Sequence, residues 1–212
     1  MKIFLDFDDT IFNTGKFKED FASIFNQNGI TNEEFNRTYY SDLAKGVKGY
    51  NPKKHLELIN WPDEYTKQET IQKLEKILEN LEKYVFEDFY ELAAKINKNN
   101  LFLISFGKME FQEIKIKNSG VLKYFADYKV VEREDKGDYI QKIVGDNPGS
   151  IFLVDDRPEQ LAKAKEKNPG LIPIRIKRKE GRYADLKDII KTETIYNLSE
   201  MTGLIEYFCQ NE

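Results

Sequence analysis

Residues 2–10 have the sequence KIFLDFDDT, in which a short apolar run is followed directly by three aspartates and a threonine. The apolar run is too short for a helix, and its β-branched and aromatic residues predict a buried strand. Asp6, Asp8 and Asp9 therefore follow the carboxyl end of that strand. Because ligands bind at this end of the strands in open α/β sheets, the stretch predicts a functional site as well as a sheet.

Two later segments repeat this arrangement. The run LFLI at residues 101–104 precedes Ser105, and the run IFLV at residues 151–154 precedes Asp155 and Asp156. Uninterrupted apolar runs are typical of strands that are covered on both faces, as in parallel sheets. If the three strands are neighbours, their polar endings meet at one edge of the sheet.

Such a meeting would place several carboxylates together, namely Asp6, Asp8, Asp155 and Asp156. Two of these charges about 4 Å apart repel by roughly 4 kcal/mol at an effective dielectric near 20, and a bound cation would relieve that repulsion. A ligand set made only of oxygen atoms favours Mg²⁺ over zinc or copper. Taken alone, the pair Asp155–Asp156 could equally cap the helix that follows it.

The composition limits the class of protein. A chain of 212 residues suits one large domain or a core with a smaller module, and its net charge of −4 argues against a general nucleic-acid binder. The lone cysteine, Cys209, cannot form an internal disulfide, and no apolar run approaches the roughly 20 residues of a membrane span. The N-terminus does not resemble a signal peptide. We therefore expect a cytoplasmic protein without a membrane partner, and the sequence leaves its oligomeric state open.

The long stretch between the first acidic strand and the strand before Ser105 has helical patterns throughout. Phe17, Phe21 and Phe25 recur at helical spacing. Thr66 and Glu69 predict a capping box at the start of a long helix. These patterns predict an inserted helical module.

Beyond residue 87, strand and helix patterns alternate, which predicts a parallel sheet with helices on both faces. We therefore expect a core of residues 1–14 and 87–212, with an insertion of residues 15–86. The expected core strands span residues 101–105, 128–132, 151–155 and 171–176, and the expected core helices lie near residues 88–98, 108–118, 137–144, 158–167 and 200–208.

The residues quoted above, taken in order, resemble the four motifs of the haloacid dehalogenase superfamily. The motifs are Asp6-Phe7-Asp8-Asp9-Thr10, then Ser105, then Lys136, then Asp155-Asp156. The resemblance spans the whole core. It implies an α/β fold with a Rossmann-like parallel sheet and an all-helical cap inserted after the first core strand, which agrees with the insertion deduced from the helical patterns.

The resemblance also implies roles for the acidic residues. Asp6 would be the nucleophile that forms an aspartyl-phosphate, and Asp8 would be the general acid and base. Mg²⁺ would be held by the Asp6 carboxylate, the backbone carbonyl of Asp8 and Asp156, with Asp155 a direct or indirect ligand.

Two further residues would bind the oxygens of the transferring phosphoryl group, namely Ser105 and Lys136. Lysine is abundant in this chain, so the assignment of Lys136 depends on its place between the second and the last motif. Arg133 and Lys123 are lesser candidates for this role.

Within this superfamily, the dehalogenases lack an acid at the position of Asp8 and need no magnesium. The presence of Asp8 and Asp156 therefore favours a phosphatase acting on a small phosphorylated metabolite, such as a sugar phosphate or a nucleotide. The alternatives are a phosphotransferase or phosphomutase similar to β-phosphoglucomutase, and a non-catalytic protein that binds a phosphorylated partner. Phe106, where many relatives carry Asn, and Arg157-Pro158, where a small hydroxyl residue is frequent, depart from the family pattern.

Other residues receive less specific interpretations. His55 is the only histidine, and we expect it at the surface or at a helix cap rather than in a catalytic triad. A local basic cluster is expected to be a solvated strand end and loop, with the attraction of an anionic substrate as the alternative. This cluster comprises Arg175, Lys177, Arg178, Lys179 and Arg182.

Overall fold

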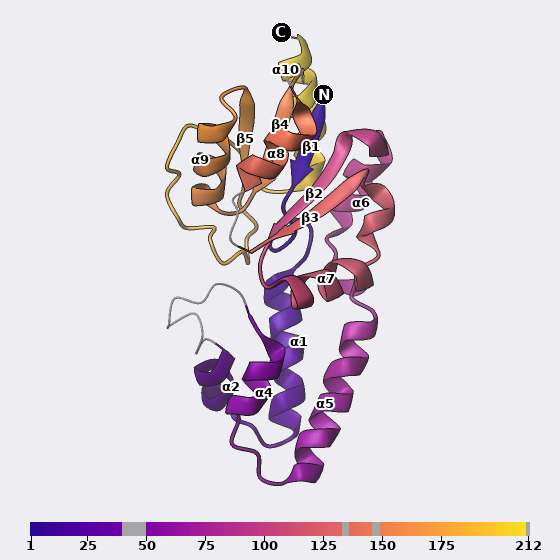
Figure 1. Ribbon diagram of the computed structural model, residues 1–212, viewed down its shortest axis with the longest axis vertical. Helices are drawn as coiled ribbons and strands as arrows, with labels where there is room; N and C mark the ends of the chain where they lie inside the picture. The colour runs from indigo at the N-terminus through magenta and orange to yellow at the C-terminus, as the bar shows by residue number, and fades with distance from the viewer. Residues whose placement is uncertain (40–49, 133–135, 146–148, 211–212) are drawn as a thin grey trace.

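The computed structural model of the chain (Figure 1) describes residues 1–39, 50–132, 136–145 and 149–210. In this part of the chain the strands form one parallel sheet in the order β3-β2-β1-β4-β5-β6. The predicted parallel α/β sheet is therefore confirmed, and the strand before Asp6 lies inside it. The strands are β1 (Lys2–Leu5), β2 (Leu101–Phe106), β3 (Asp127–Val131), β4 (Ile151–Asp155), β5 (Leu171–Ile176) and β6 (Glu193–Ile195).

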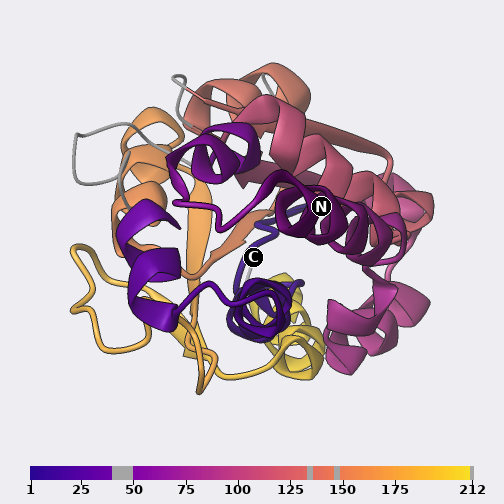
Figure 2. The same cartoon turned by 90° about the horizontal axis from the view of Figure 1, so that it is seen from below.

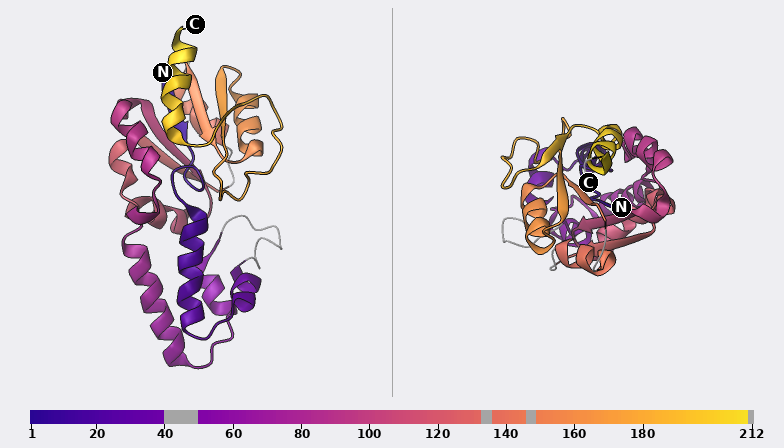
Figure 3. Two further views of the ribbon diagram at one scale, coloured as in Figure 1. Left: turned by 180° about the vertical axis from the view of Figure 1, so that it is seen from behind. Right: turned by 90° about the horizontal axis from the view of Figure 1, so that it is seen from above.

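Helices cover both faces of the sheet. Alternate residues of β1 point to opposite faces, so that Phe4 packs with Ile140 and Leu161, whereas Leu5 belongs to the same core cluster as Phe89 and Met201. Helix α8 lies in front of the sheet in Figure 1, and α10 lies in front in the reverse view of Figure 3. The core helices are α6 (Glu87–Lys95), α7 (Met109–Asn118), α8 (Lys136–Val144), α9 (Pro158–Lys167) and α10 (Met201–Gln210).

The described residues between Thr14 and Glu79 form a separate group of helices, which we call the helical lobe. It comprises α1 (Thr14–Gln27), α2 (Asn32–Tyr39), α4 (Pro52–Leu58) and α5 (Glu64–Glu79). Phe17, Phe21 and Phe25 form the buried face of α1, as their spacing predicted. The lobe extends away from the sheet in Figure 1 and lies across one end of the core when seen from below (Figure 2). Both termini lie at the opposite end of the molecule (Figure 3).

The segments that lead into and out of the helical lobe are paired with each other. The Asn13 N–H donates to the Tyr84 carbonyl at 2.8 Å, and the Phe86 N–H donates to the Ile11 carbonyl at 2.9 Å. Phe12 also forms an antiparallel bridge with Val85. The chain therefore leaves the core and returns to it at one place, close to the predicted boundaries of the insertion.

The predicted capping box at Thr66 and Glu69 is wrong. Helix α5 begins at Glu64, and Asp63 is its N-cap. The Asp63 carboxylate accepts hydrogen bonds from the Thr66 N–H at 2.7 Å and from the Thr66 hydroxyl at 2.9 Å. Aspartate is among the strongest N-cap residues, so the helix starts at the earlier of the two polar residues.

The prediction that His55 lies at the surface or at a helix cap is also wrong. Its side chain is 2% exposed, and its ring stacks on Phe25 with a centroid distance of 5.0 Å. Its Nδ1 lies 2.7 Å from the Tyr50 hydroxyl. Burial lowers the pKa of His55 to about 4, so the imidazole is neutral at neutral pH. A histidine can join an aromatic core when one ring nitrogen has a polar partner.

The basic cluster is solvated only in part. Arg175 and Arg178 are buried, each paired with an aspartate, namely Asp188 for Arg175 and Asp88 for Arg178. The sequence pattern alone did not reveal these partners, because both lie in other segments of the chain.

Among the described residues, no helix combines the length and the apolar character that crossing a membrane requires.

Candidate active site

The predicted site residues follow the carboxyl ends of the central strands. Asp6 comes directly after β1, and its N–H donates to the Val154 carbonyl of β4 at 2.9 Å. Asp155 is the last residue of β4 and Asp156 is the next residue. Because β1 and β4 are paired in register, the two acidic endings lie side by side.

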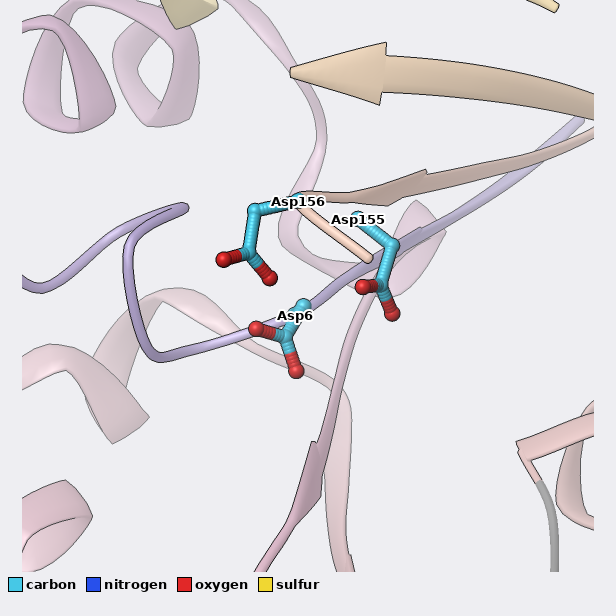
Figure 4. Close-up of side chains that lie close together, drawn as sticks. All are labelled: Asp6, Asp155 and Asp156. Carbon is cyan, nitrogen blue, oxygen red and sulfur yellow. The ribbon is translucent and has the colours of Figure 1, made fainter. Parts of the chain in front are cut away.

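Three of the predicted acids form a compact carboxylate trio. One carboxylate oxygen from each of Asp6, Asp155 and Asp156 lies within 4.8 Å of the other two. Figure 4 shows that the three carboxylate groups point toward one another. All three side chains are buried. We call Asp6, Asp155 and Asp156 the carboxylate trio.

Lys136 lies beside the trio. It is the first residue of α8, it is 1% exposed, and its ammonium donates to Asp6 and, at 2.5 Å, to Asp155. Although burial disfavours its charged form, the Asp155 and Asp6 carboxylates raise the pKa of Lys136. Of the lesser candidates, Lys123 is exposed and stacks over the Tyr124 ring, and Arg133 lies outside the described residues.

Lys136 supplies one positive charge to the three carboxyl groups of the trio. Burial raises the pKa of Asp6 to about 7, with Lys136 opposing this shift and Asp155 adding to it. Burial, together with the Asp6 and Asp155 carboxylates, raises the pKa of Asp156 well above its ordinary value. The Asp156 Oδ2 atom has no hydrogen-bond partner among the described residues. A buried set of carboxylate oxygens with one oxygen unpartnered fits a hard divalent cation such as Mg²⁺.

Asp8 has a different environment from the trio. Its carboxylate accepts hydrogen bonds from the Thr14 hydroxyl at 2.9 Å, the Gln112 amide at 2.9 Å and the Lys115 ammonium at 2.5 Å. Burial alone would raise the pKa of Asp8, but Lys115 and then Arg182 lower it to about 2. Asp8 is therefore a carboxylate at neutral pH.

The turn after Asp8 has an unusual backbone. Asp9 has a φ of 56°, in the left-handed region that non-glycine residues rarely adopt, and its N–H donates to the Phe12 carbonyl at 2.8 Å. Its buried carboxylate accepts a hydrogen bond from the Arg182 Nε at 2.6 Å. These contacts hold the turn that presents Asp8.

Ser105 lies inside β2, fully buried, and Gln112 connects it to Asp8. The Gln112 amide nitrogen lies 2.6 Å from the Ser105 hydroxyl and 2.9 Å from the Asp8 carboxylate. The sequence pattern did not indicate a role for Gln112 or Lys115. The available signal was their spacing of three residues on the predicted helix at 108–118, which places both on one face.

These side chains border a crevice of about 500 Å³ between the core and the helical lobe. Asp6, Asp8 and Asp156 line it. Ser105 and Lys136 are buried and contact the lining residues Gln112 and Asp6. Aromatic and cationic side chains form most of the remaining lining. They are Phe17, Lys18, Tyr39, Tyr50, Phe106, Lys108, Phe111, Lys115, Arg157, Arg182 and Tyr183.

Comparisons with known proteins identify the fold. No family model and no curated protein sequence matches the chain. Among solved structures, a haloacid dehalogenase-like hydrolase from Burkholderia xenovorans superposes with a TM-score of 0.67 at 16% identity, covering 98% of this chain and 97% of that one. The HAD-hydrolase YfnB from Bacillus subtilis, bound to magnesium, gives 0.64 at 15% identity, covering 97% and 98%. The L-2-haloacid dehalogenase from Xanthobacter autotrophicus gives 0.62 at 13% identity, covering 97% and 98%.

The chain therefore has the fold of the haloacid dehalogenase-like hydrolases. This confirms the fold that the motif resemblance implied. The similar structures include a dehalogenase as well as other hydrolases, so the shared fold is compatible with more than one chemistry. The assignment of an activity therefore depends on the side chains of the site.

Proposed function

We propose that this protein is a Mg²⁺-dependent phosphatase that removes phosphate from a small phosphorylated metabolite, such as a sugar phosphate or a nucleotide. The observation that carries the proposal is the buried carboxylate trio beside Asp8 at the crevice. An acid at the position of Asp8 and an acid at Asp156 are the features that separate phosphate chemistry from dehalogenation in the resemblance described above.

In the proposed reaction, a carboxylate oxygen of Asp6 attacks phosphorus, and the bond from phosphorus to the leaving oxygen breaks. Asp8 gives a proton to that oxygen. Asp8 then takes a proton from the water that hydrolyses the aspartyl-phosphate. A phosphoryl dianion beside Asp8 would raise the pKa of its carboxyl, because like charges disfavour ionisation, so that Asp8 takes up from solvent the proton that it gives to the leaving oxygen.

The other residues bind and orient. Mg²⁺, held by the Asp6 carboxylate, the Asp8 backbone carbonyl and Asp156, would supply positive charge between the nucleophile and the phosphate. Asp155 lies against this position and holds Lys136. Lys136 and Ser105 are assigned to the phosphoryl oxygens. Lys136 also orients Asp6 through their hydrogen bond.

We assign the helical lobe, within residues 15–86, the role of a cap. Its residues Phe17, Tyr39 and Tyr50 form one side of the crevice, and core residues form the other. A lobe in this position excludes water from the site and contacts the leaving group. The proposed division of the chain is thus a core of residues 1–14 and 87–212 and a cap of residues 15–86.

The test is phosphate release from a panel of sugar phosphates and nucleotides, with Mg²⁺ and with a chelator. Wild-type protein is expected to release phosphate only with Mg²⁺, and Asp6→Asn is expected to release none. Asp185→Asn is the matched control, because Asp185 is an exposed aspartate on the loop after β5. Release that continues in the chelator, or in Asp6→Asn, would contradict the proposal. Formation of an isomerised product instead of free phosphate would indicate the phosphomutase alternative.

A further inference from the structure

The loop between β5 and β6 forms part of the crevice wall, and two buried arginines anchor it. Arg175, at 0% exposure, donates to the Tyr183 carbonyl at 2.6 Å and to the Asp188 carboxylate at 3.1 Å. This arginine is on β5, so it ties two points of the loop to the sheet. Arg175 therefore fixes the position of the Tyr183 backbone relative to the sheet.

The second anchor ties the start of the loop to other elements. Arg178 forms an ion pair with Asp88 of α6 and donates to the Thr10 carbonyl at 2.7 Å. Its guanidinium carbon lies 4.0 Å from the centroid of the Phe86 ring. Because Thr10 belongs to the turn after Asp8, this contact joins the loop to the candidate active site.

The anchored loop completes a stack of alternating rings and guanidinium groups. The Arg157 guanidinium lies 5.4 Å from the Phe106 ring centroid and 5.2 Å from that of Tyr183. The Arg182 guanidinium lies 5.4 Å from the same Tyr183 ring. All four side chains line the crevice. Cation–π contacts of this kind fix the direction of each guanidinium group.

Arg182 lies at the end of this stack, and some of its hydrogen-bond donors have no acceptor among the described residues. Its Nε donates to Asp9, and among the described residues no hydrogen bond involves its terminal nitrogens, Nη1 and Nη2. The side chain is 47% exposed and lines the crevice that also contains Asp6 and Asp8. Arginine binds carboxylates and phosphates through pairs of such donors. Arg182 is therefore a cation of fixed position, and its terminal nitrogens can bind a ligand in the crevice that contains Asp6 and Asp8.

We infer that Arg182 binds a second anionic group, a carboxylate or a further phosphate, on the leaving group of the substrate. The inference rests on the proposed phosphatase function and narrows its substrate class to metabolites with two anionic groups. Tyr183, Arg157 and Phe106 hold the guanidinium in position. A purely structural role, in which Arg182 only neutralises Asp9, is the alternative that the experiment must separate.

The experiment compares matched substrates that differ in the second group. Glycerol 3-phosphate and 3-phosphoglycerate differ by a carboxylate, and fructose 6-phosphate and fructose 1,6-bisphosphate differ by a phosphate. In at least one pair, we expect kcat/KM of the wild-type protein to be roughly ten- to a hundredfold higher for the doubly anionic member than for the other member. A preference of this size is what charge-assisted hydrogen bonds from an arginine provide. The pair that shows the preference identifies the group.

Arg182→Gln is expected to lower this ratio of kcat/KM by about tenfold or more, and Arg182→Lys, which keeps a charge beside Asp9, to lower it less. Lys179→Gln, an exposed lysine on the same loop, is the matched control and should leave the ratio unchanged. A ratio that Arg182→Gln leaves unchanged, with both members of a pair losing kcat/KM equally, would establish the structural role and overturn the inference.

Binding gives an independent readout that does not need turnover. In the Asp6→Asn background, calorimetry should show tighter binding of the doubly anionic member, and Arg182→Gln should abolish that difference. Equal affinities of the two members would overturn the inference even if hydrolysis is observed. Absence of phosphate release from the whole panel of sugar phosphates and nucleotides would instead overturn the proposed function, while the affinity ratio would still decide the role of Arg182.

Discussion

At the scale of single residues, the two acids of the first motif differ because their neighbours differ. Asp6 shares a buried position with Asp155 and Asp156 and one lysine, so burial raises the pKa of its carboxyl. Asp8 is two residues away and has Lys115, Gln112 and Thr14 as donors, so its carboxyl stays ionised. The same side-chain type therefore has two different protonation equilibria within one motif.

The pairing of Lys115 with Asp8 predicts a large coupling energy. Lys115→Met should lower the free energy of unfolding by about 2 kcal/mol at neutral pH, because it leaves the half-buried Asp8 carboxylate without its cation. Asp8→Asn combined with Lys115→Met should be less destabilising than the sum of the two single changes by more than about 1 kcal/mol. Urea denaturation of the four proteins measures this cycle. Additive effects would show that the two side chains are not coupled in solution.

The buried histidine predicts a pH dependence of stability. Its folded pKa of about 4 lies below its ordinary value of 6.5, so the unfolded chain binds more protons between these values. The contribution of neutral His55 is complete above pH 6.5 and is lost as the pH falls toward 4, on the order of 3 kcal/mol in total. The free energy of unfolding of His55→Phe, measured in urea from pH 7 to 4, should fall less steeply than that of the wild type. Parallel curves for the two proteins would contradict this assignment.

The sequence predicted that Asp6, Asp155 and Asp156 meet, but it did not predict that Lys115 and Arg182 lie beside Asp8 and Asp9. Asp6, Asp155 and Asp156 follow strands directly, so neighbouring strands are enough to bring them together. Lys115 and Arg182 reach the crevice from a helix and a loop whose orientations depend on tertiary packing. Charge patterns along the chain do not contain that information.

At the scale of elements, the core strands and helices were predicted closely because each apolar run is bounded by polar or glycine-containing turns. Strands β4 and β5 and helix α9 have their predicted bounds. Strand β6 was missed, because its three residues are too few to show a periodic pattern and two of them are only half-buried. Leu81 and Val85 continue the helical spacing of the apolar residues in the long helix of the lobe, but that helix ends at Glu79.

The N-cap of α5 predicts a measurable local contribution. Asp63→Ala removes the acceptor for the Thr66 N–H, and we expect the free energy of unfolding to fall by about 1 kcal/mol. Asp185→Ala, an exposed aspartate that caps no helix, is the control and should change it by less than about 0.5 kcal/mol. Urea midpoints that are equal for the two variants would place the start of the helix elsewhere.

At the scale of the whole molecule, the carboxylate trio connects metal binding with stability. If the trio binds Mg²⁺ as proposed, Mg²⁺ at a hundredfold excess over its Kd should stabilise the folded protein by about 3 kcal/mol, because the trio forms only in the folded chain. For a chain of this length the melting temperature should rise by roughly 5 to 10 °C. Differential scanning calorimetry at constant ionic strength measures the shift.

The same measurement on Asp156→Asn tests where the metal binds. This variant should lose most of the Mg²⁺-dependent shift, whereas Asp185→Asn should keep it. A shift of equal size in Asp156→Asn would place the stabilising ion away from the trio. This result would be independent of any enzymatic assay.

The paired segments around Phe12 and Val85 have a consequence for how such a chain can diversify. Because the two ends of the intervening stretch are already hydrogen-bonded to each other, replacing it changes the closure entropy of the core only slightly, whatever the length of the replacement. The stretch from Gly15 to Lys83 can therefore differ in length at little entropic cost to chain closure, as long as its two ends stay adjoining. Thr14 lies outside this stretch, because its hydroxyl donates to the Asp8 carboxylate.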